Sequence, residues 1–84
     1  MKVLFLPRAE KSLTKFSTTE QKFIVEKILI FSKSPQPLKS PNVRKVKLFN
    51  FFRLRVGKFR VFFEIEDSLI LIGQIRRRNE KTYR

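Results

Sequence analysis

The residues of this chain that could take part in chemistry are almost all cationic. Its 84 residues include 20 lysines and arginines against seven acids, a formal net charge of +13 at pH 7, and neither histidine nor cysteine occurs. The usual general acid–base and the usual nitrogen and sulfur metal ligands are therefore excluded. A one-sided basic excess, with a pI near 11.1, indicates a polyanionic partner such as a nucleic acid.

Three of the arginines are spaced so that they could surround one phosphate. Arg53 and Arg55 alternate with apolar residues, which places them on one face of a strand, and Arg60 follows on the next strand, beyond Gly57. A guanidinium holds phosphate oxygens through a planar fork and stabilises negative charge that grows in a transition state. The alternative interpretation is that these residues are only the solvated face of a strand.

A second basic run lies near the end of the sequence. Arg77 stands in the middle of it, and Tyr83, the one tyrosine, follows. Taken alone, such a run is a generic basic tail, and a lone tyrosine in this place is usually a surface or packing residue. Tyr83 could instead stack on a base or transfer a proton. The residues expected to contact the polyanion without doing chemistry are Lys45, Lys47, Lys58, Arg76 and Arg78.

The first half of the chain is predicted to form two helices. Apolar residues recur at helical spacing over about residues 8–16, which predicts the first helix. Ser17 and Glu20 have the spacing of a capping box, so a second helix should begin at Ser17 and end before the prolines of residues 34–41. The short connection predicts an antiparallel helical hairpin.

Strands are predicted before and after this hairpin, because the apolar period there is two. An interruption near Asn50 indicates a bend or bulge inside the second strand, and Gly57 marks a turn with positive φ. The predicted strands are residues 2–6, 43–56, 59–66 and 69 onward. The order is therefore β-α-α-β-β-β. It predicts one α+β domain over residues 1–84, with the hairpin packed on one face of a small, mostly antiparallel four-stranded sheet.

The apolar run at the start of the sequence ends at Pro7. It is too short for a signal peptide or a membrane span, so a cytoplasmic protein with no membrane partner is expected.

Two segments resemble a known family. Residues 52–63, which read Phe-Arg-Leu-Arg-Val-Gly-Lys-Phe-Arg-Val-Phe-Phe, resemble the central signature of the RelE/ParE toxins, and residues 76–84 resemble its closing arginine-to-tyrosine element. The predicted element order is also similar from end to end. The resemblance implies a RelE-like fold and the toxin of a type II toxin–antitoxin system. It further implies a cognate antitoxin as partner, mRNA cleavage in the ribosomal A site, and no cofactor or metal.

The same resemblance implies roles for individual residues. Arg53 and Arg55 match the two basic residues before the glycine turn, and Arg60 matches the arginine that contacts phosphate. Arg77 matches the proposed general acid and Tyr83 the catalytic tyrosine. RelE-type sites often carry lysine where Arg53 and Arg55 stand, and arginine is a poor general base. Tyr83 is thus the better candidate for the base.

Two other functions stay open at this point. A ParE-like toxin that acts on DNA gyrase shares the central signature but generally lacks the closing Arg and Tyr, so Arg77 and Tyr83 favour the nuclease. A non-catalytic basic protein that binds RNA or the ribosome would also explain the charge, and would bind RNA in a salt-sensitive way without cutting it.

Overall fold

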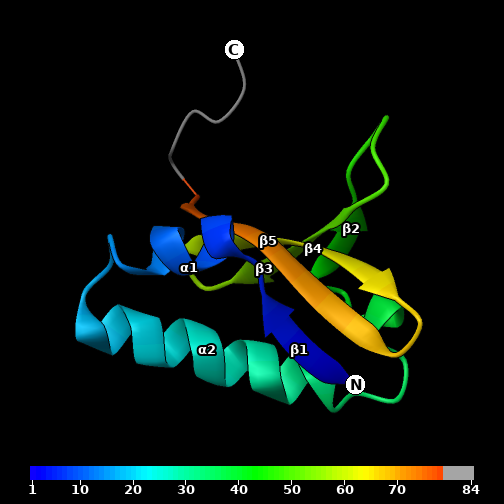
Figure 1. Ribbon diagram of the computed structural model, residues 1–84. Helices are drawn as coiled ribbons and strands as arrows, with labels where there is room; N and C mark the ends of the chain where they lie inside the picture. The colour runs from blue at the N-terminus through cyan, green and yellow to red at the C-terminus, as the bar shows by residue number, and fades with distance from the viewer. Residues whose placement is uncertain (79–84) are drawn as a thin grey trace.

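The structure is a computed structural model that describes residues 1–78, and in it two α-helices lie against one face of a five-stranded sheet (Figure 1). The elements are β1 (Lys2–Phe5), α1 (Pro7–Leu13), α2 (Thr18–Ser32), the 3-10 helix η1 (Pro37–Lys39), β2 (Val43–Lys45), β3 (Phe52–Val56), β4 (Phe59–Glu66) and β5 (Leu69–Arg77). The strand order is β1-β5-β4-β3-β2, with β1 parallel to β5 and the other pairs antiparallel. The α+β architecture with helices on one face is confirmed.

The prediction of a single strand over residues 43–56 was wrong, and this is why the sheet has five strands rather than four. β2 and β3 are the arms of a hairpin, with Val43 opposite Leu54 and Arg44 opposite Arg53. Between them the Val46 amide donates to the Phe51 carbonyl at 3.0 Å. Alternation continues through both arms of a hairpin, so a period of two cannot by itself reveal the turn.

The helices begin and end for local reasons. The predicted capping box is present: the Ser17 hydroxyl accepts from the Glu20 amide at 3.1 Å, and the Glu20 carboxylate accepts from the Ser17 amide at 3.0 Å. α1 stops at Leu13, earlier than predicted, and the Thr14 hydroxyl donates to the Lys11 carbonyl. The chain then turns so that the buried Phe16 ring lies 5.0 Å from that of Phe59.

The core fills the space between α2 and the sheet. Ile24 and Ile28 of α2 are fully buried against the strands, and Val61, Ile70 and Ile72 are the strand residues beneath them. Every second residue of β3 and β4 points into this layer, and β5 does the same except at the register shift near Gly73, so the intervening residues lie on the opposite, uncovered face. Among residues 1–78, no helix has both the length and the apolar character needed to cross a bilayer.

Candidate nucleic-acid interface

The uncovered face of the sheet carries arginines directly opposite one another on neighbouring strands. In the strand register Arg44 faces Arg53, Arg55 faces Arg60, and Arg60 faces Arg76. Like charges placed opposite each other across a ladder destabilise the pair. This face therefore concentrates positive charge at a cost to folding, which is typical of a surface built for an anionic ligand.

A small hollow of about 120 Å³ lies among these side chains. It is lined by Pro41, Asn42, Arg44, Arg53, Arg55, Arg60 and Arg78. No acidic residue belongs to this lining, and within residues 1–78 none of its arginines forms a salt bridge. A water molecule takes up about 30 Å³ in the liquid, so the hollow has room for one small anion or a few waters. We refer to it as the arginine hollow.

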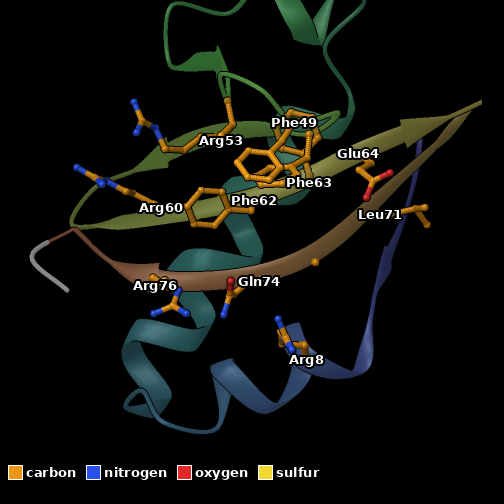
Figure 2. Close-up of a pocket in the computed structure, with 13 residues that line it drawn as sticks. Arg8, Phe49, Arg53, Arg60, Phe62, Phe63, Glu64, Leu71, Gln74 and Arg76 are labelled. Atoms are coloured by element: carbon orange, nitrogen blue, oxygen red, sulfur yellow. The ribbon is translucent and has the colours of Figure 1, made fainter. Parts of the chain in front are cut away.

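A wider and more apolar basin of about 400 Å³ adjoins the hollow on the same face (Figure 2). Three phenylalanines form its aromatic part: the rings of Phe49 and Phe51 stack at 5.2 Å, and Phe51 meets Phe62 edge-on at 5.9 Å. Arg53 and Arg60 line both the basin and the hollow. In Figure 2 their guanidinium groups extend in the same direction, away from the Phe62 ring.

Arg77 does not join this group, although Arg77 and the open-face arginines were expected to act together. It pairs with Phe59 in the register, which puts its side chain on the helix-covered face. There its Nη1 and Nη2 each donate to a Glu20 carboxylate oxygen at 3.1 Å, and its guanidinium lies 5.2 Å from the centre of the Phe16 ring. The Ser17 amide, followed by Arg77, holds the pKa of the Glu20 carboxyl below its ordinary value.

The other predicted residues are distributed around the open face. Arg76 lies on it beside Arg60, and the Gln74 amide can be oriented so that its oxygen accepts from Arg76 Nη2 at 2.9 Å. Arg78 lines the hollow, and its amide donates to the Lys58 carbonyl in the β3–β4 turn. Tyr83 lies outside the described residues, so its predicted role is not addressed by the structure.

Two of the predicted RNA-binding lysines lie in the β2–β3 hairpin, and Lys45 is not on the open face. Lys45 is opposite Phe52, which puts it on the helix side of the sheet, and its Nζ donates to the Phe49 carbonyl at 2.8 Å. Lys47 is exposed in the turn. The open-face position on β2 belongs to Arg44, because the hairpin reverses the parity that a single strand would have had.

Sequence reasoning missed three features of the site: Arg44, Arg8 at the edge of the basin, and the aromatic cluster. Arg44 would have been found if the hairpin had been recognised. Arg8 belongs to α1 and reaches the basin only through the packing of that helix beside β5 (Figure 2). The interruption that Phe49 and Phe51 make in the alternation was the available signal for the aromatic cluster.

Comparisons with known proteins bear on the identity of this fold and site. A family model described as the ParE toxin of the type II toxin–antitoxin system parDE matches residues 3–82. No curated protein sequence matches the chain.

Solved structures similar to this one include toxin–antitoxin complexes. The archaeal RelE–RelB complex from Pyrococcus horikoshii is similar over 95% of this chain and 97% of that chain, with a TM-score of 0.73 and 21% identity. A RelBE complex from Mycobacterium tuberculosis has a TM-score of 0.74 at 23% identity, covering 92% of this chain and 96% of that one. The intact E. coli RelBE complex has a TM-score of 0.69 at 19% identity, covering 95% and 98%. At these identities the likeness establishes the fold.

Proposed function

The chain belongs to the ParE toxin family of type II toxin–antitoxin systems, and from this premise we propose that it is an endoribonuclease that cuts translated mRNA in the ribosomal A site. The observation that carries the proposal is the arginine hollow, where Arg53, Arg55 and Arg60 converge with no acidic residue in the lining. A phosphodiester is the anion that this arrangement fits, since each guanidinium can offer a planar fork to phosphate oxygens.

The proposed reaction is attack of a ribose 2′-oxygen on the adjacent phosphorus. The new bond from the 2′-oxygen to phosphorus forms as the bond to the 5′-oxygen breaks, leaving a cyclic phosphate on one product and a 5′-hydroxyl on the other. Arg53, Arg55 and Arg60 neutralise the charge that builds on the non-bridging oxygens. Donors of this kind are worth about 10²–10³ in rate each.

The proton transfers require two further groups. Arg76 lies beside Arg60 on the open face, so in this proposal Arg76, rather than Arg77, hydrogen-bonds to the leaving 5′-oxygen while that oxygen takes a proton from water. Tyr83 remains the proposed base, because arginine, with its high pKa, is a poor general base.

The proposed partner in the resting cell is a cognate antitoxin with an acidic segment. Such a segment would cover the open face and neutralise part of the net charge of +13. The similar RelE and RelBE structures are themselves toxin–antitoxin complexes.

A second candidate is inhibition of DNA gyrase without RNA chemistry. Two observations favour it: the matching family carries the ParE name, and Arg77 is paired with Glu20 on the covered face, away from the arginine hollow. In this alternative the open face would bind a protein or DNA surface and no phosphodiester would be cut.

The test is to induce the wild type, Arg60→Gln, Tyr83→Phe and the control Lys22→Gln in a test cell and map transcript 5′ ends. Lys22 is exposed on α2, so its exchange removes the same charge at a distance from the hollow. We expect growth arrest with new ends inside reading frames for the wild type and Lys22→Gln, and neither effect for Arg60→Gln or Tyr83→Phe. Arrest without new ends, accompanied by loss of DNA supercoiling, would reject the nuclease in favour of gyrase inhibition.

A further inference from the structure

The arginine hollow and the adjoining basin are lined by different kinds of side chain but have two lining residues in common. The hollow is lined by arginines, whereas the basin contains the rings of Phe49, Phe51 and Phe62. Arg53 and Arg60 belong to both linings. A ligand that occupied both would need an anionic group joined to a flat apolar group at short range.

The aromatic part of the basin is open to solvent at a cost. Phe49 is 55% exposed, and its neighbour Leu48 at the hairpin tip is 93% exposed with a φ of 71°. Large apolar side chains gathered on one exposed surface mark a binding site more often than a neutral surface. The same lining also contains arginines, and a surface that combines aromatic rings with cations suits a ligand that has both a planar base and an anionic group.

The floor of the basin is open because residue 73 is glycine. A Cβ built on Gly73 would meet nothing nearer than the Phe62 carbonyl oxygen at 3.8 Å, an ordinary contact. β5 also shifts register here, since Phe62 pairs with Gln74 but Phe63 pairs with Ile72. The irregularity leaves Gly73 without a partner in the register, and because glycine has no side chain, nothing at this position fills the basin.

We propose that the basin is a nucleobase subsite, in which the base attached to a nucleotide held in the arginine hollow stacks on the ring of Phe62 and lies edge-on to the ring of Phe51. The inference rests on the proposed function, which supplies single-stranded RNA as the ligand, and it adds where the base goes. A nucleotide has the required parts, a phosphate and a planar aromatic base joined through one sugar. Stacking of this kind tolerates any base, because every base has a π-face.

Charge decides between RNA and an apolar peptide segment as the occupant. Four arginines, Arg8, Arg53, Arg60 and Arg76, line the basin against a single acid. That acid, Glu64, lies with Leu71 at the end of the basin away from Arg53 and Arg60 (Figure 2). An apolar peptide would have to desolvate these cations without compensating them, whereas the phosphates flanking a stacked base would compensate them.

The test compares two uncleavable oligomers of equal length bound to the purified full chain. One is a 2′-O-methyl RNA that carries a single 2-aminopurine, whose fluorescence falls on stacking, and the other is abasic throughout. The chain has no tryptophan, so its own fluorescence does not mask the signal. We expect the wild type to quench the 2-aminopurine and to bind the base-bearing oligomer about 5- to 100-fold more tightly than the abasic one.

The variants separate the base subsite from the phosphate site. Phe62→Leu keeps an apolar side chain but removes the ring, and Gly73→Leu fills the basin while leaving every aromatic residue unchanged. In both variants the ratio of the affinity for the base-bearing oligomer to that for the abasic oligomer should fall close to one. Binding of the abasic oligomer should stay unchanged. Phe23→Leu, the same exchange on α2, should keep the wild-type ratio. Arg53→Gln should weaken both oligomers alike, which tests the proposed function separately.

Three results would overturn the inference. A wild-type ratio of one would remove the base subsite while leaving the phosphate site and the proposed function in place. Absence of binding to both oligomers would refute the proposed function, and the inference with it. If instead Phe62→Leu keeps the ratio and weakens binding of an acidic amphipathic peptide of Glu, Leu and Ala, the basin is a protein-docking surface.

Discussion

The two faces of the sheet surround their arginines with different groups, as the consecutive residues Arg76 and Arg77 show. Arg77 lies on the covered face, where both its terminal nitrogens donate to Glu20 and its guanidinium stacks near the rings of Phe16 and Phe59. Arg76 lies on the open face opposite Arg60, another cation. Within residues 1–78 the open-face arginines form no salt bridge.

This contrast separates arginines that serve folding from arginines that serve a ligand. A cation that is needed for folding is compensated inside the chain, as Arg77 is by Glu20. Cations gathered opposite one another without acids raise the free energy of the folded state. Within residues 1–78 no acid compensates them, which is the physical reason for proposing that phosphates bind the open face.

The largest expected effect comes from exchanging one arginine on each face. Arg60→Gln should lower the rate of RNA cleavage by about 10²–10³ and leave thermal stability unchanged or slightly raised. Arg77→Gln should lower stability, since the loss of its contact with the aromatic rings alone costs about 0.5–1 kcal/mol and the ion pair is lost as well. Cleavage assays and thermal unfolding of both variants test whether activity is lost in Arg60→Gln and stability in Arg77→Gln. Equal loss of stability in both would contradict the division between the faces.

A smaller effect should follow from Gly57→Ala in the β3–β4 turn. Gly57 has a φ of 56°, and a Cβ at this position would lie 2.9 Å from Phe23 Cε2 of α2. The left-handed conformation costs a non-glycine residue about 1–2 kcal/mol, and the close approach to Phe23 adds to that. Urea unfolding measures the loss, with Lys58→Ala in the same turn as control. A free energy of unfolding equal to that of the wild type would show that the covered face is not tightly packed at this turn.

The contribution of Glu20 should depend on pH. Its folded-state pKa is lowered, first by the Ser17 amide and then by Arg77, so its charged form stabilises the fold above the ordinary glutamate pKa. That stabilisation is lost as the pH falls through the lowered value. The difference in Tm between the wild type and Glu20→Gln should therefore be present at pH 7 and shrink on acidification. Glu26→Gln, on the same helix, controls for the lost charge; a pH-independent difference would exclude this linkage.

The smallest effect is expected from Arg44→Glu on β2. This exchange places an acid directly opposite Arg53 and converts a repulsive cross-strand pair into an attractive one, worth about 0.2–1 kcal/mol. Thermal unfolding should show a slight rise in stability, while titration with single-stranded RNA should show weaker binding. Higher stability without any loss of RNA affinity would place Arg44 outside the ligand site.

Much of the fold could be predicted from local patterns. Helical spacing and the Ser17–Glu20 capping box were sufficient for α2, and the predicted turn at Gly57 has the positive φ expected of it. The β2–β3 hairpin was not predicted in this way, because the interruption of the alternation near Asn50 fits a bulge within one strand as well as a turn between two strands that reverses their parity. Its turn contains Leu48 at a φ of 71°, a conformation that the identity of leucine does not signal.

The candidate site was predictable only in part. Arg53, Arg55 and Arg60 could be grouped from alternation and the glycine turn, and the structure places all three around the arginine hollow. Arg76 and Arg77 are equally basic and adjacent, so composition could not separate them. Which of the two lies on the open face depends on the register of β5 against β4, including the irregularity at Phe62 and Phe63.

The sequence by itself determined the excess of positive charge, the absence of histidine and cysteine, and the alternation that divides each strand into an apolar and a basic side. These properties depend only on residue identity and on the local geometry of the chain. The tertiary structure decided which basic residues meet, because strand register, the β2–β3 hairpin and the packing of α1 join residues distant in sequence. It brought Arg44 to the hollow, took Arg77 to Glu20, and set three phenylalanines beside the arginines.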